Sequence, residues 1–174
     1  TVLGENSSCP GGLLAGINFV PNRIHTGDIT TNTTWQGNIN IFSDLQVTDG
    51  CTLSLAPGCE VTMMGDYSFV VDNAYIRTID PQGERVVFKA ADGVNWRGLE
   101  IKNVPGNEVL TVENIAVSGA DAGIYVNSAG ITVSSRVEIV NCLLDGNGIG
   151  IAGNRPHYIK ISNCTIKNSQ FVGN

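Results

Sequence analysis

The stretch Gly98-Leu99-Glu100-Ile101 has two counterparts further along the chain, Gly123-Ile124-Tyr125-Val126 and Gly148-Ile149-Gly150-Ile151. The leading glycines are 25 residues apart both times. Residues in these copies alternate between two faces, which is the period of a β-strand with one buried side. A repeat of about 20–50 residues is typical of stacked units, each of which buries its apolar face against its neighbours.

A second series places an asparagine between two strand-like segments. Asn114, Asn141 and Asn163 follow one another after 27 and then 22 residues. Asparagine tolerates left-handed backbone angles, and its side-chain amide both donates and accepts hydrogen bonds. We therefore predict a bend in the chain at each asparagine and an internal ladder of stacked amides.

Short strands broken by Gly, Asn, Asp and Ser, without a window of helical period, predict an all-β fold of the β-solenoid type. Each repeat is then one coil, whose strands pair in parallel with the coils above and below. The earlier part carries a degenerate coil, and Trp35–Ile41 matches Trp96–Ile101 in spacing, which predicts the same place in the coil for both. Further strands are expected at 45–47, 52–55, 60–63, 67–72, 74–79 and 85–89.

We expect a solenoid of about six coils in residues 31–174. Further coils can follow past the C-terminus. Residues 1–30 do not fit the coil pattern and are predicted to form an irregular cap. An open solenoid end exposes unpaired strand edges, which invite association. We expect the C-terminal end to be covered by further coils or by the segment Leu13–Val20 of another chain, stacked end to end.

These repeats resemble those of the right-handed parallel β-helix superfamily, the pectate-lyase-like group. The Gly-Ile and Asn-x-x-Ile pattern in residues 94–170 is also similar to NosD-type repeats. Residues 48–63, which read TDGCTLSLAPGCEVTM, look like the opening coils of bacterial surface β-helix proteins. The resemblance implies a right-handed coil and a secreted or cell-surface location. It does not specify an activity, because many enzymes and non-enzymes share this fold.

Composition excludes several partners. The net charge of −6 argues against binding nucleic acid or an anionic membrane, which favour a basic patch. No apolar run reaches the roughly 18 residues of a membrane span. The start of the chain does not show the basic and apolar regions of a signal peptide, so none is expected. With only two histidines and no closely paired cysteines, we expect no metal site, although calcium at an Asp-Gly turn stays an alternative.

Five cysteines leave two alternatives open. Cys142 and Cys164 occupy equivalent places, each just after a ladder asparagine, so they should lie about 4.8 Å apart on neighbouring coils. They form either a disulfide or, as the favoured interpretation, two stacked buried thiols. A bridge from Cys9 to Cys51 or Cys59 would attach the cap to the first coils.

The resemblance also indicates where an enzymatic site would lie. Enzymes of the pectate-lyase-like group place their site on the outer face of successive coils and in the turns before those strands. This implies Glu100 and Asp121 as carboxyl groups for acid–base work and Arg97 as the cation that meets a uronate. Tyr125, Asp145 and Asn147 are the implied substrate-binding residues.

Two functions follow from these observations. The favoured hypothesis is a non-catalytic extracellular β-solenoid, an adhesin, stalk or fibre subunit that contacts polysaccharide or other surface proteins. The alternative is a carbohydrate-active enzyme, a polysaccharide lyase, epimerase or glycosidase, that acts on an acidic polysaccharide. The glycine at position 150 favours the first, because it leaves the predicted outer face blank in the third copy of the repeat.

Overall fold

The computed structural model describes residues 23–106, 108–127, 136–154 and 159–170, which contain β-strands and no helix. The strands of the described residues are β1 (Arg23–His25), β2 (Thr33–Trp35), β3 (Asn38–Ile41), β4 (Leu45–Val47), β5 (Thr52–Leu55), β6 (Glu60–Met63), β7 (Ser68–Asp72), β8 (Tyr75–Thr78), β9 (Val86–Ala90), β10 (Gly98–Lys102), β11 (Val109–Glu113), β12 (Ile115–Ser118), β13 (Ala122–Asn127), β14 (Arg136–Val140), β15 (Leu143–Asp145), β16 (Ile149–Gly153), β17 (Ile159–Ser162) and β18 (Thr165–Lys167).

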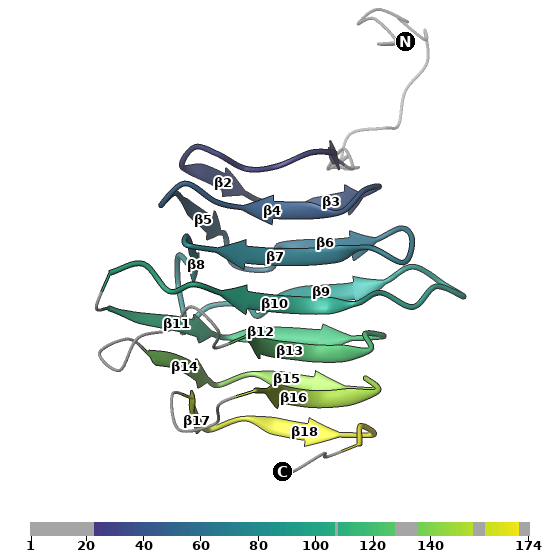
Figure 1. Cartoon of the computed structure of the whole chain (residues 1–174). Helices are drawn as coiled ribbons and strands as arrows, with labels where there is room; N and C mark the ends of the chain where they lie inside the picture. The colour runs from purple at the N-terminus through teal and green to yellow at the C-terminus, as the bar shows by residue number, and fades with distance from the viewer. Residues whose placement is uncertain (1–22, 107, 128–135, 155–158, 171–174) are drawn as a thin grey trace, which may run out of the picture.

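The strands wind into a parallel β-solenoid with three walls (Figure 1). The long wall runs in the order β1-β3-β6-β9-β12-β15-β18, and the short wall runs β16-β13-β10-β7-β4. The split wall consists of two sheets, β2-β5-β8 and β11-β14-β17. From β2 onward, every third strand therefore returns to the same wall. The described residues make about five turns, from β2-β3-β4 to β14-β15-β16, with β17 and β18 beginning the next. The all-β solenoid is confirmed, and the right-handed sense of the coil stays a prediction.

The core follows from period-2 alternation in register across the coils. Leu99 pairs with Ile124, Ile101 pairs with Val126, and all four are fully buried, as predicted. A row of aromatic rings runs along the solenoid from the half-buried His25 into the core. The rings meet edge-on or stacked, with centroids 5.2, 6.0, 5.3 and 6.5 Å apart in the series His25, Trp35, Phe69, Phe88 and Trp96. Such pairs are worth about 0.5–1.5 kcal/mol each beyond the apolar area they bury.

The register of the third repeat copy differs from the prediction by two residues. Ile124 pairs with Ile151, and Tyr125 pairs with Ala152. The outward position of β16 is therefore taken by Ala152, and the predicted alignment of Gly148 and Gly150 with the other copies is wrong. A slip of two residues keeps the same side chains on the same face, because the side-chain period of a strand is two.

The prediction that the two tryptophans occupy the same place in the coil is wrong. Trp35 ends β2 in the split wall, whereas Trp96 precedes β10 in the short wall. Both side chains are buried packing residues. At the N-terminal side, residues 1–22 of the predicted cap lie outside the described residues, and Arg23–His25 within it pairs with β3 as strand β1.

Burial declines toward β18. Cys164 and Ile166 are half-buried, and Ile161 is 48% exposed, although the pairing of Ile161 with Ile139 and of Ile166 with Leu144 places both isoleucines on the inner face. These residues belong to the last described turn, and the described residues supply no further coil to cover it. Association through this end stays a prediction.

The three asparagines lie at the predicted bends between the split wall and the long wall. Their φ angles are 54°, 51° and 54° for Asn114, Asn141 and Asn163. The Asn141 amide donates to Asn114 Oδ1 at 3.3 Å, and the Asn114 amide donates to the carbonyl of Gly83 at 3.2 Å. Asn163, predicted as the third member of the internal ladder, is exposed instead, because the described residues supply no coil beyond it.

Candidate functional site

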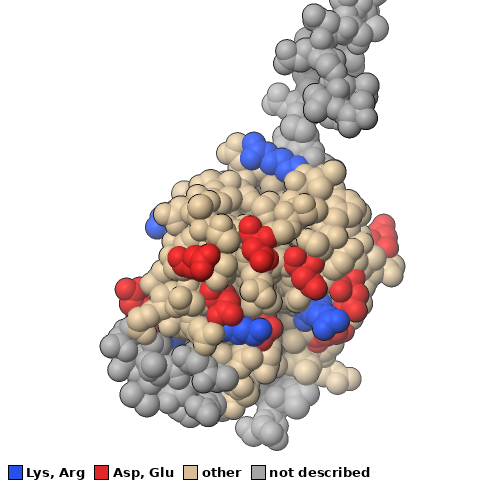
Figure 2. Space-filling model, turned by 45° about the horizontal axis from the view of Figure 1, so that its top comes forward, with Lys and Arg blue, Asp and Glu red and all other residues tan. Residues whose placement is uncertain are grey.

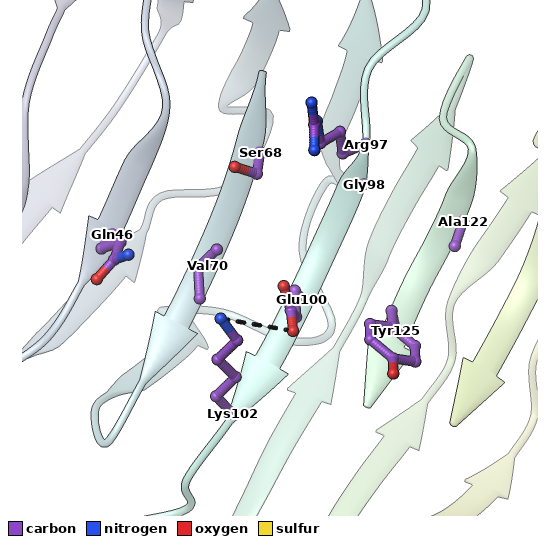
Figure 3. A pocket seen from close by; sticks show the side chains of 9 residues that line it. All are labelled: Gln46, Ser68, Val70, Arg97, Gly98, Glu100, Lys102, Ala122 and Tyr125. Atoms are coloured by element: carbon purple, nitrogen blue, oxygen red, sulfur yellow. Dashed lines mark ion pairs between the residues drawn. The ribbon is translucent and has the colours of Figure 1, made fainter. Parts of the chain in front are cut away.

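A hollow of about 280 Å³ lies on the outer face of the short wall (Figure 3). Four neighbouring strands and the residue before β10 contribute its lining, which consists of Gln46, Ser68, Val70, Arg97, Gly98, Glu100, Lys102, Ala122 and Tyr125. The in-register pairing explains why these side chains meet. Glu100 pairs with Val70 on one side and with Tyr125 on the other, and Val70 pairs with Gln46. The hollow is therefore a row of outward side chains that crosses the coils.

Glu100 is the carboxylate of this lining, and it has polar partners. Its Oε1 lies 3.7 Å from Lys102 Nζ and accepts a hydrogen bond from the Asn127 amide at 3.2 Å. The Glu100 side chain is 23% exposed, so these partners satisfy a carboxylate that is partly withdrawn from water. In Figure 3 Lys102 reaches back toward Glu100, while Tyr125 presents its ring from the adjacent strand.

Arg97 lies at the other end of the hollow. Its Nε is 3.6 Å from Asp66 Oδ1, and both side chains are largely exposed, so water screens this pair. Nearby, the backbone N–H and the hydroxyl of Ser68 donate to Asp44, each at 2.8 Å. These hydrogen bonds lower the pKa of Asp44, with a smaller contribution from the charge of Arg97.

The structure brings Arg97, Glu100 and Tyr125 together and leaves Asp121 outside the lining. Asp121 accepts a hydrogen bond from the Asn95 side chain in the turn before β13. Its backbone N–H donates to the carbonyl of Trp96, four residues before Glu100 on the paired strand. At about 3.3 Å per residue, Glu100 and Asp121 are separated by roughly 13 Å along the strands. A glycosidase holds its two carboxyl groups closer, at about 5–9.5 Å.

Asp145 and Asn147 do not reach the hollow either. Asp145 is on β15 in the long wall, where it meets Lys167 at 3.1 Å and the Asn168 amide at 2.8 Å. These contacts, the Asn168 hydrogen bond first, lower the pKa of Asp145.

Asn147 is 3% exposed and faces inward. Its amide donates to the carbonyl of Val117 at 2.9 Å, and its Oδ1 accepts from the backbone N–H of Ala120 at 3.1 Å. Both interactions support the coil beneath it. Asp145 and Asn147 therefore lie outside the hollow, and their assignment to substrate binding stays a prediction.

Sequence reasoning missed Gln46, Ser68 and Lys102. The signal for Lys102 was present, because it lies two residues after Glu100 and so shares its face. Gln46 lies between Leu45 and Val47, an alternation that matches Leu99–Ile101, but only the coil register shows that the two strands belong to the same wall.

Four described cysteines, Cys51, Cys59, Cys142 and Cys164, are free thiols, and Cys9 lies outside the described residues. The backbone N–H of Cys142 points at the Cys164 sulfur, 3.4 Å away, so the two residues are neighbours on adjacent coils. Burial raises the pKa of the Cys59 thiol to about 11.

Within the described ranges, no three His, Cys, Asp or Glu side chains are arranged to hold a metal ion. The same residues include no helix with the length and apolar character needed to cross a membrane. Figure 2 shows acidic side chains spread over the face it presents, with fewer basic ones among them, in keeping with the net charge of −6.

Comparison with known proteins assigns no family. No family model matches this chain, and no curated protein or solved structure matches it. The architecture is that of a parallel β-solenoid, and the function has to be inferred from the chain's own residues.

Proposed function

We propose that this chain is a non-catalytic β-solenoid of a secreted or cell-surface protein, and that the hollow on its short wall binds a saccharide strand with carboxylate groups. The observation that carries the proposal is the row of outward side chains across in-register coils, in which Tyr125 lies beside Glu100, while Arg97 and Lys102 come before and after Glu100 on its own coil. We place the fold, on its repeat pattern, with the pectate-lyase-like parallel β-helices as part of the same proposal.

The lining matches the chemistry of a uronate-containing saccharide. The ring of Tyr125 offers an apolar face with a polar tip, suited to the C–H face of a sugar. The guanidinium of Arg97 can bind a carboxylate with two parallel hydrogen bonds, and Lys102 supplies a second positive charge. Gln46 and Ser68 add hydrogen-bonding groups for hydroxyls. Because the chain is acidic overall, we expect the affinity to be modest and to fall with salt.

The arrangement of carboxyl groups favours binding over catalysis. Glu100 is engaged by Lys102 and Asn127, and Asp121 is directed to Asn95 outside the lining. A glycosidase needs two carboxyl groups across one bond, and a lyase needs a base free to remove a proton. The described lining provides one paired carboxylate, so it can hold a sugar without reacting with it.

Calorimetric titration with a uronate oligosaccharide and a neutral oligosaccharide of the same length tests the proposal. We expect binding of the uronate oligomer only, weakened about tenfold or more by Tyr125→Ala and by Arg97→Ala, a change of about 1.4 kcal/mol or more. Asp145→Ala on the long wall is the matched control and should bind as the unsubstituted chain does.

Ultraviolet assay of the same mixtures for unsaturated uronate, together with a reducing-end assay, tests the non-catalytic part. Turnover that disappears in Glu100→Ala would refute it and would favour the enzymatic alternative. Equal affinity for the neutral oligomer, or no binding at all, would refute the assignment of the hollow.

A further inference from the structure

We propose that Cys142 and Cys164 form a thiol–disulfide exchange site, in which a small-molecule disulfide oxidises the pair and links two successive coils covalently. This inference does not depend on the saccharide hollow, which lies on another wall. It concerns how the last described turn is held to the rest of the solenoid.

The two cysteines are stacked neighbours. Cys142 precedes β15 and Cys164 precedes β18, and these strands pair in register from Leu143 with Thr165 onward. Equivalent residues on adjacent parallel strands are about 4.8 Å apart, inside the usual Cα separation of a disulfide. The 3.4 Å contact from the Cys142 backbone N–H to the Cys164 sulfur places that sulfur against the other cysteine. The spacing of the two strands therefore permits a disulfide, and closing the bond requires rotation of the two side chains.

The two thiols differ in access. Cys142 is 1% exposed, and its sulfur lies near the carbonyls of Val112 and Val140, at 3.6 and 3.3 Å. Cys164 is half-buried, in the last described turn, with its sulfur near the carbonyl of Ile139 at 3.4 Å. A reagent in solution therefore meets Cys164 first, and Cys142 is positioned to complete the reaction.

The electrostatics support the same division of roles. The hydrogen bond from Cys142 lowers the pKa of Cys164 to about 6, which favours its thiolate, and the same interaction together with burial raises the pKa of Cys142. The positive charge of Arg85 favours the thiolate at both positions. The Arg85 guanidinium is fixed beside the pair by hydrogen bonds to the carbonyl and side chain of Asn141, both at 3.2 Å. The thiolate is the nucleophile in disulfide exchange.

The reaction balances in two steps. The Cys164 thiolate attacks one sulfur of the small disulfide, forms a mixed disulfide and releases one small thiolate. Cys142 then gives its proton to a small thiolate in solution, and its sulfur attacks the Cys164 sulfur and displaces the second small thiolate. The two cysteines lose two electrons and the small disulfide gains them. The product joins residues 142 and 164 and should raise the thermal unfolding midpoint, because it restricts the unfolded chain.

The test uses the full chain with Cys9→Ser, since Cys9 is outside the described residues and would add a competing thiol. The folded protein is incubated with oxidised glutathione at neutral pH, quenched with acid, alkylated and mapped by mass spectrometry. We expect a Cys142–Cys164 disulfide, reversed by a dithiol reductant, while Cys51 and Cys59 stay alkylatable as buried internal controls. Oxidation should also raise the unfolding midpoint. Failure to form this disulfide in the folded protein, or its formation only under denaturing conditions, would overturn the proposal.

Two further measurements separate the roles. Cys142→Ser should trap glutathione on Cys164, whereas Cys164→Ser should leave Cys142 unmodified. Competitive alkylation of the protein without these serine substitutions, at a series of pH values, checks the same order without relying on either variant to fold. Cys164 should react at least tenfold faster than Cys142 near neutral pH. Equal rates, or faster reaction at Cys142, would contradict the assignment of Cys164 as the attacking thiol.

Discussion

Replacement of Asn147 by leucine tests the assignment of this residue to the interior of the solenoid. Its buried side chain bonds the carbonyl of Val117 and the N–H of Ala120. Leucine has a similar size and no hydrogen-bonding group, so both backbone groups would lose their partner. Each unpaired buried group costs about 1–3 kcal/mol, or roughly 2–6 kcal/mol for the two. The added apolar side chain offsets about 1–2 kcal/mol. We expect a net destabilisation of about 2.5 kcal/mol, the difference between the middles of the two ranges, whose outer limits are about 0–5 kcal/mol.

Urea unfolding followed by the fluorescence of the buried Trp35 and Trp96 measures this change. The control is Asn38→Leu, the same substitution at an exposed position on β3, where a change within about 0.5 kcal/mol is expected. If Asn147→Leu leaves the midpoint where the control leaves it, the two hydrogen bonds do not support the coil. If it instead abolishes saccharide binding in a protein of unchanged stability, the predicted role of Asn147 in substrate binding would be supported.

Three further predictions concern packing and pH. Gly98→Ala should lower the unfolding midpoint strongly or prevent folding, because its φ is 110° and an added Cβ would lie 1.7 Å from the carbonyl oxygen of Ala122; a stable variant would show that the coils are not so close. Phe69→Ala should cost about 3–5 kcal/mol in urea unfolding, since the ring is fully buried between two other aromatic rings, and a loss below about 1 kcal/mol would contradict that packing. Ser68→Ala should raise the pKa of Asp44 toward its ordinary value in an NMR titration. Since the folded pKa of Asp44 is lowered, its contribution to stability is present above the ordinary value of 3.8 and is lost as the pH falls through the folded pKa. If the pKa of Asp44 in Ser68→Ala equals that of the unsubstituted chain, the Ser68 hydroxyl does not supply this contribution.

The fold was predictable because strand alternation and the two repeat series agree with each other. The asparagine bends were readable for the same reason, since few residues other than glycine adopt left-handed angles readily. The register of the third copy could not be predicted from the sequence. Gly148-Ile149-Gly150-Ile151 is similar to itself after a shift of two residues, and such a shift keeps the isoleucines on the inner face. Only the length of the intervening turn decides between the two alignments.

The placement of the candidate site residues was predictable on single strands and was not predictable at the turns. Glu100 and Tyr125 were expected outside because their neighbours on either side are apolar, and the structure places them in one row. Asp121 and Asn147 lie in polar turns, where a residue that bonds the backbone of the next coil has the same sequence environment as one that faces solvent. Their directions depend on the coils above and below, which local sequence does not specify.

The most direct test of the saccharide-binding account is a chemical-shift map of the isotopically labelled chain titrated with a uronate oligosaccharide. The account predicts saturable shifts centred on Tyr125, Glu100 and Lys102 and extending across the short wall to Gln46, with little change on the long wall around Asp145. Shifts confined to another wall, or a spectrum unchanged at millimolar saccharide, would contradict it.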